Sequence, residues 1–122
     1  MLDCLIIGLG GFAGSVLRYL AGKIPLGGSG GFPVSTLLIN VLGSFVIGLA
    51  AALAARYSGL SPRLMLFIRV GLCGGFTTFS SFSLETFELL RAGSCGAAAL
   101  YALLSAALCV LAVLLAHLLV KA

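Results

Sequence analysis

Charged and metal-binding side chains are scarce in this chain. Only 8% of its 122 residues are charged, with three acidic residues against seven basic ones, and it has a single histidine. His117 has no cysteine, aspartate or second histidine at ligand spacing, and the four cysteines, at positions 4, 73, 95 and 109, contain no C-x-x-C pair. This scarcity argues against a zinc site and a disulfide framework, so we expect these residues to pack in apolar surroundings.

The formal net charge of +4 comes from basic residues that are spread along the chain, without a basic tail. Such a distribution fits attraction to the anionic headgroups of a lipid bilayer, and we expect no nucleic-acid partner. The sparse titratable groups form no catalytic constellation, and we do not expect an enzyme.

Apolar residues, by contrast, make up 61% of the chain, and the mean hydropathy is +1.27. A soluble core of this length could not bury so much hydrophobic surface, which predicts a multi-pass membrane protein. Four apolar segments, at 2–20, 34–55, 64–90 and 95–120, approach or exceed the roughly 20 residues that cross a bilayer. We therefore predict one all-α transmembrane domain of four helices over 1–122, with both termini on the same side and a glycine-rich turn over 25–33.

In the third segment, residues 74–82 have low helix propensity although they lie in the middle of its apolar run. Gly74 and Gly75 lack side chains, and the threonines and serines after them have hydroxyls that compete with helical hydrogen bonds. We predict a helix break here, at mid-membrane depth. Because irregular backbone cannot face lipid, the freed groups must be buried or must line a wet cavity that holds an ion. Phe79 and Phe82 share a helix face after the break, where core packing is the alternative.

Polar residues follow the second and fourth segments at strict four-residue spacing, which places each set on one helix face. The two sets are Thr36, Asn40 and Ser44, and Tyr101, Ser105 and Cys109. A buried amide or hydroxyl in lipid must find a partner, either on a neighbouring helix or on a permeating solute. Contacts between helices and a polar pathway are therefore both open interpretations of these stripes.

The first segment contains GLGGFA at residues 8–13, which matches the dinucleotide-binding pattern G-x-G-x-x-A. That interpretation fails because an acidic residue should follow about 20 positions later, whereas the next acid after Asp3 is Glu85. Gly10 and Gly14 instead form a G-x-x-x-G pair. This spacing predicts the close approach of another helix backbone.

Basic residues flank the segments almost equally on the two sides of the membrane. Lys23 and Arg91 lie on one side and Arg56, Arg63 and Lys121 on the other, while Arg69 is expected to snorkel to the interface near Arg63. So weak a bias leaves the orientation undecided. A chain that inserts both ways can pair with an inverted copy, and one subunit is too small to enclose a wide pathway. We therefore predict an antiparallel homodimer.

No ionisable residue lies at the centre of the first, second or fourth segment. Proton-coupled transporters usually keep a titratable group there, so a passive pathway is favoured. Amide and hydroxyl hydrogens can donate to an anion, and phenylalanine offers an anion the positive edge of its ring. A hard cation would need more oxygen ligands than the stripes supply. The pattern therefore favours a small anion.

Three blocks of this sequence resemble the signatures of the Fluc (CrcB) family of fluoride channels. They are GGFAG at 10–14 with Arg18 and Tyr19, TLLINVLGSF at 36–45, and GLCGGFTTFSSFSLE at 71–85. The likeness covers all four segments in order, and the third block is the most specific. It implies a dual-topology homodimer with two fluoride pores, which exports fluoride passively through the inner (plasma) membrane of a microbe. It also implies a structural sodium ion at the centre of the dimer.

The resemblance also implies roles for individual residues. Phe79 and Phe82 would line the pores as an aromatic box, with Asn40 as a donor and Thr36 and Ser44 as further pore positions. The carbonyls of Gly74 and Thr77 would bind the sodium ion. The polar track on the last helix would be Tyr101, Ser105 and Cys109, although the third position is commonly a hydroxyl residue and a thiol is a weaker donor. Arg18 would lie near the aqueous vestibule and Glu85 beside the aromatic box.

Two other functions remain open at this point. A small multidrug transporter is also a short four-helix inverted dimer, but it exchanges protons for drug through a central carboxylate in its first span. Only Asp3, at the very end of that span, is available here. A membrane scaffold without transport would use the polar stripes only as contacts between helices.

Overall fold

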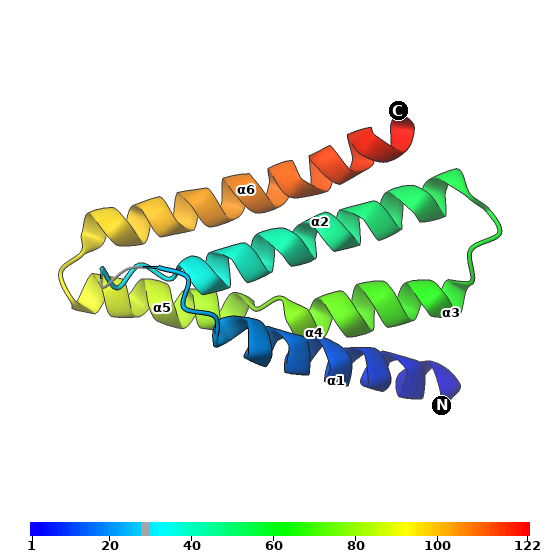
Figure 1. Ribbon diagram of the computed structural model, residues 1–122, viewed down its shortest axis with the longest axis horizontal. Coiled ribbons are helices and arrows are strands. Elements are labelled where there is room, and N and C mark those ends of the chain that lie inside the picture. Colours follow the sequence, from blue (N-terminus) through cyan, green and yellow to red (C-terminus); the bar gives the residue numbers. More distant parts are fainter. Residues whose placement is uncertain (28–29) are drawn as a thin grey trace.

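Four helical spans make up the chain (Figure 1). The computed structural model describes residues 1–27 and 30–122, and Gly28 and Ser29 of the predicted glycine-rich turn lie outside this part. The first two spans are α1 (Leu2–Gly22) and α2 (Val34–Arg56), and the last is α6 (Cys95–Lys121). All four spans are long and apolar enough to cross a membrane, and no strand occurs among the described residues. The prediction of an all-helical, four-span membrane protein is confirmed.

The third span, Pro62–Arg91, consists of several pieces. It comprises α3 (Pro62–Met65), a π-helix η1 (Leu66–Cys73), a single turn α4 (Gly74–Phe76) and α5 (Phe79–Arg91). The predicted break is therefore present, at Thr77 and Thr78, within the predicted stretch 74–82. Thr77 and Thr78 have extended backbone angles, with ψ values of 158° and 113°. The π-helical stretch was not predicted.

The spans run up and down in alternation, so the two termini lie at the same end of the bundle (Figure 1), as predicted. α1 packs against η1 and α4, and α2 packs against α6. At the end that carries the termini, Arg63 of α3 forms an exposed ion pair with Asp3 of α1 at 3.2 Å. Arg56 donates a hydrogen bond to the carbonyl of Val120 there and so covers the end of α6.

Glycines line the contact between α1 and the third span. A Cβ on Gly10 would lie 2.6 Å from the Phe67 carbonyl oxygen and 3.0 Å from the Cα of Gly71, and a Cβ on Gly75 would lie 3.1 Å from the Cα of Gly11. Only the absence of side chains lets these backbones approach so closely. The close-packing role predicted for Gly10 and Gly14 is therefore confirmed. We call this contact the glycine seam.

The same seam explains why the helix does not break at Gly74 and Gly75. Gly75 must stay in regular helix to lie against α1, where a larger residue would collide with the Gly11 backbone. Thr78, by contrast, is a good residue for starting a new helix, because its hydroxyl accepts a hydrogen bond of 3.1 Å from the Ser81 N–H. Packing thus holds the glycines in α4, and capping by Thr78 starts α5 at Phe79.

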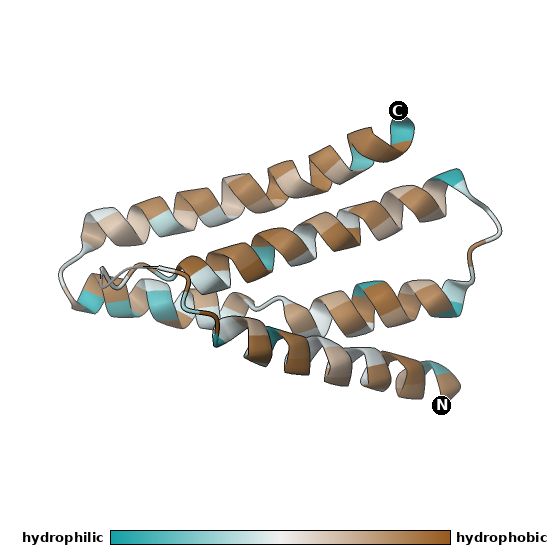
Figure 2. Ribbon diagram, viewed as in Figure 1, coloured by the Kyte–Doolittle hydropathy of each residue, from teal (hydrophilic) through white to brown (hydrophobic). Residues whose placement is uncertain are grey.

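Most of the outer surface is apolar, as a lipid environment requires (Figure 2). Large side chains such as Phe12 and Leu103 are 72% and 70% exposed. Hydrophilic residues gather at the helix ends and along α5 (Figure 2). A further group of polar residues, among them Asn40, Thr77 and Ser105, lies beside the break.

Candidate functional site

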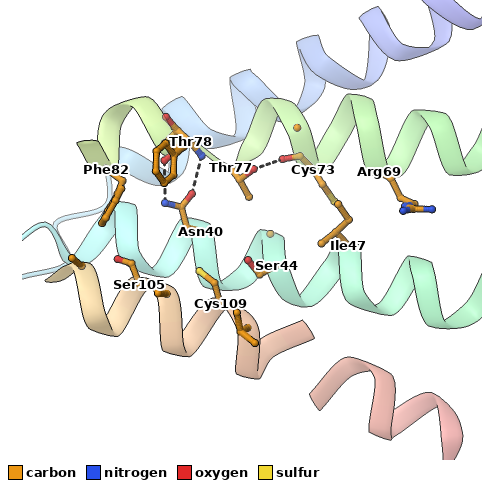
Figure 3. Close-up of a pocket in the computed structure, with 16 residues that line it drawn as sticks. Asn40, Ser44, Ile47, Arg69, Cys73, Thr77, Thr78, Phe82, Ser105 and Cys109 are labelled. Carbon is orange, nitrogen blue, oxygen red and sulfur yellow. Dashed lines mark hydrogen bonds between the residues drawn. The ribbon is translucent and has the colours of Figure 1, made fainter. Parts of the chain in front are cut away.

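A cavity of about 520 Å³ lies beside the break, between α2, the third span and α6 (Figure 3). Eight of the residues singled out from the sequence line it: Asn40, Ser44, Gly74, Thr77, Phe79, Phe82, Ser105 and Cys109. Residues that are up to 69 positions apart in the sequence, from Asn40 to Cys109, thus face one space. No aspartate or glutamate lines this cavity in the described part of the chain.

Asn40 holds the broken backbone through both ends of its amide. Its Nδ2 donates to the Thr78 carbonyl at 3.1 Å, and its Oδ1 accepts from the Thr78 N–H at 2.8 Å (Figure 3). This pair of bonds replaces the helical partners that Thr78 loses at the break, which a membrane interior demands. One of the two Nδ2 hydrogens takes part, so the second stays available to another acceptor.

The backbone carbonyls in and around α4 differ in their hydrogen-bond partners. Gly75 accepts a hydrogen bond of 3.0 Å from Nε of Arg18, which reaches it from α1. The Cys73 carbonyl accepts from both the N–H and the hydroxyl of Thr77, at 2.9 and 2.8 Å. No hydrogen bond from the described residues reaches the carbonyl oxygens of Gly74 and Thr77.

These two carbonyls are the groups in the site that fit a cation. No cluster of three histidine, cysteine, aspartate or glutamate side chains occurs in the described residues, so the chain offers no site of the transition-metal type. Free carbonyl oxygens suit a hard cation such as sodium, which replaces its water by oxygen ligands. Two such oxygens are too few for a complete coordination shell.

Phe79 and Phe82 lie together at the start of α5. Their ring centroids are 5.3 Å apart, and Phe82 also lies 5.1 Å from the ring of Tyr101, whose other side meets Phe32 at 5.5 Å. Phe79 is 78% exposed, so it is not part of the core of a single subunit. These inclined rings turn edges as well as faces toward their surroundings.

Glu85 joins three helices at the edge of the cavity. Its carboxylate accepts a hydrogen bond of 2.7 Å from the Thr36 hydroxyl of α2 and one of 2.6 Å from the Tyr101 hydroxyl of α6. Thr36, Tyr101 and Glu85 thus form a cluster of their own outside the cavity lining. Tyr101 is fully buried, and its ring carries the contact to Phe82.

Ser105 is the clearest free donor in the cavity. The residue is 9% exposed, and its hydroxyl oxygen is buried without a hydrogen-bond partner among the described residues. Ser44 from α2 and the Cys109 thiol from α6 line the same space (Figure 3). A buried hydroxyl without a partner is costly, so its presence here indicates a ligand or water that the cavity receives.

Two features of the site were not predicted from the sequence. Arg69, which was expected to snorkel to the interface near Arg63, lines the cavity. Arg18 reaches the Gly75 carbonyl, 57 positions away, and no sequence pattern signals this contact. For Arg69 a signal existed, because it is the one charged residue between Leu64 and Leu84 of an apolar segment.

Comparison with known proteins gives consistent matches. The family model described as "CrcB-like protein, Camphor Resistance (CrcB)" matches residues 5–117. Three curated relatives named "Fluoride-specific ion channel FluC" are 45%, 52% and 48% identical to the chain, from Methylobacterium radiotolerans, Thermus thermophilus and Chlorobaculum tepidum. The matches cover 93%, 80% and 83% of this chain and 81%, 78% and 80% of the respective relatives.

Proposed function

The chain belongs to the CrcB-like family, and from this premise we propose that it is a passive fluoride-selective channel. Its relatives are ion channels, so the protein is a multi-pass membrane channel and not an enzyme. The observation that carries the proposal is the cavity, which combines hydrogen-bond donors and phenylalanine rings and has no carboxylate in the described lining. Such a lining can replace the water around a small anion without binding it permanently.

Four side chains supply the donors of this pathway. The Ser105 hydroxyl has no other partner, and Asn40 keeps one amide hydrogen beyond the one that Thr78 uses. Ser44 adds a hydroxyl from the same helix as Asn40. Cys109 extends the α6 track as a weaker donor. Phe79 and Phe82 meet the dehydrating anion with their positive ring edges.

Thr36, Tyr101 and Glu85 bound the pathway beside the aromatic box. Their hydroxyl hydrogens are held by the carboxylate, so each hydroxyl can donate to an anion only when it leaves Glu85. The cluster also fixes the Tyr101 ring against Phe82. The Gly75 carbonyl uses only the Nε–H of Arg18. Arg18 can therefore donate its other guanidinium hydrogens to an anion in the aqueous vestibule.

The working unit is an antiparallel homodimer with two pores in the inner (plasma) membrane. Three observations support a second copy: the 78% exposure of Phe79, the free carbonyls of Gly74 and Thr77, and the even spread of basic residues over both ends. The carbonyls of Gly74 and Thr77 from two copies would hold the structural sodium ion. When bound, sodium supplies a positive charge that neutralises carbonyl oxygens turned toward each other.

Efflux from vesicles that contain the pure protein tests this function. We expect fluoride to leave down its own gradient, without a proton gradient, and chloride to stay behind. Equal passage of chloride and fluoride would contradict a fluoride-selective channel. Proton-dependent uptake of a cationic drug would favour the transporter, and no transport of either kind would favour the scaffold. Compartment-specific reporters on the C-terminus test dual topology, because a single orientation would contradict it.

A further inference from the structure

The five arginines of the chain differ in whether their guanidinium groups have a partner. Four of them do: Arg18 binds the Gly75 carbonyl, Arg56 the Val120 carbonyl and Arg63 the Asp3 carboxylate, and Arg91 lies 5.9 Å from the centre of the Phe87 ring. Arg69 has no hydrogen bond, ion pair or aromatic partner within residues 1–27 and 30–122. An arginine without a partner inside a membrane span is unusual and marks a functional position.

Arg69 lies at one end of the cavity. Figure 3 shows it opposite the end that holds Phe82 and Ser105, with Ile47 and Ser44 between them. Arg69 belongs to the π-helix η1, in which residues five apart overlie one another. Its backbone carbonyl oxygen would accordingly lie 4.0 Å from a Cβ on Gly74. Its side chain lines the cavity.

No carboxylate of the described chain offsets this charge. Asp3 is paired with Arg63, and Glu85 accepts from Thr36 and Tyr101 at the far side of the aromatic box. Glu88 lies further along α5 and does not line the cavity. The Arg69 side chain is exposed in the single chain and borders the cavity. A fixed positive charge beside low-dielectric walls concentrates anions.

We propose that Arg69 forms a capture site for a small monovalent anion at the end of the cavity away from the phenylalanines. Fluoride gathered here enters the donor-lined part of the cavity with part of its water still attached. The inference rests on the proposed function. It adds an anion-binding position with a full positive charge, whereas the rest of the lining offers hydrogen-bond donors alone.

The site predicts a specific dependence on ionic strength. R69Q should lower fluoride efflux roughly tenfold at low salt, because the local concentration of the anion falls. Raising the salt outside to about 1 M with sodium gluconate, where the Debye length is about 3 Å, should nearly remove the difference from the wild type. R69K keeps the charge and should retain most of the flux. The matched control is R63Q, which removes the same charge from a surface position of the same span and should behave as the wild type.

Each outcome of this experiment is decisive. If the wild type conducts and R69Q conducts equally well at every ionic strength, the capture site is wrong while the channel stands. The same holds if R63Q slows efflux as much as R69Q, because the effect then comes from surface charge. If R69K is as slow as R69Q although both form intact dimers by size-exclusion chromatography, the guanidinium shape and not the charge matters, which also contradicts the site. A wild type that passes no fluoride overturns the proposed function together with this inference.

Discussion

The two faces of the broken third span are built in opposite ways. Toward α1, backbone meets backbone across the glycine seam, where a Cβ on Gly71 would lie 2.9 Å from the Cα of Gly10. Toward α2 and α6, the same segment borders a cavity of about 520 Å³. Along the seam the backbones touch, whereas the second face has a buried hydroxyl, Ser105, without a partner among the described residues. Close backbone packing at the seam thus holds the broken helix in place, and the cavity face keeps an unpaired donor for ion chemistry.

The largest effect is expected on the cavity face, from Asn40→Asp. The new carboxylate cannot donate to the Thr78 carbonyl, and it repels fluoride by about 4 kcal/mol at about 4 Å for an effective dielectric constant of about 20. Fluoride efflux should therefore fall on the order of a hundredfold or more. Asn40→Ser weakens the hydrogen bonds to Thr78 without adding charge, so its fluoride efflux should fall much less. Unchanged efflux in Asn40→Asp would remove this residue from the pathway.

The next largest effect is a loss of stability, expected from a substitution in the glycine seam. In Gly14→Ala the new methyl group would lie 2.8 Å from the Phe76 nitrogen and would also collide with the Leu72 carbonyl. Because both neighbours are backbone, we expect a loss of about 3 kcal/mol in the free energy of unfolding, measured by denaturation in detergent. Gly11→Ala is the control on the same helix, since its methyl group meets nothing within 4 Å. Equal stability of the two variants would show that the seam is looser than described.

Phe82→Ile separates conduction from packing within the cavity face. Isoleucine keeps an apolar side chain but loses the ring edge and the 5.1 Å contact with Tyr101. We expect roughly a tenfold drop in fluoride efflux from the lost ring edge. The proposed dimer should remain intact by size-exclusion chromatography. If this variant alone loses the dimer, the ring is a packing residue, as the sequence alone also allowed.

The smallest effect is expected from the unpartnered hydroxyl. Ser105→Ala removes a donor that has no protein partner, so the free energy of unfolding should stay the same or rise slightly. Fluoride efflux should nevertheless fall several-fold, about what one hydrogen bond of roughly 1 kcal/mol supplies. Cys109→Ser adds a stronger donor on the same track and should equal or exceed the wild type. A loss of stability without a loss of flux in Ser105→Ala would assign the hydroxyl to packing.

Sequence patterns predicted the features that depend on local spacing. The four spans follow from apolar runs of sufficient length, and the close approach at Gly10 and Gly14 follows from a four-residue repeat of glycine. The side shared by the two termini follows from the even number of spans. These predictions needed no knowledge of which helices are neighbours.

Features that depend on distant partners were predicted less well. The break begins at Thr77 because α1 holds Gly75 in regular helix, and Asn40 receives the freed backbone of Thr78 from 38 positions away. The π-helical winding of η1, which contains Arg69, has no local sequence signature that we recognise. Spacing placed Thr36 and Tyr101 on polar faces, but it could not show that both hydroxyls donate to Glu85.

The glycine seam has a mechanical consequence for the rings that follow the break. α1, η1 and α4 are interlocked along their backbones and so behave as one rigid platform. Thr77 and Thr78, whose backbone is not helical, join this platform to α5, and Asn40 fixes Thr78 from α2 through two hydrogen bonds. The orientation of Phe79 and Phe82 relative to the Gly74 carbonyl is therefore set from two sides, by the glycine contacts with α1 and by one amide of α2.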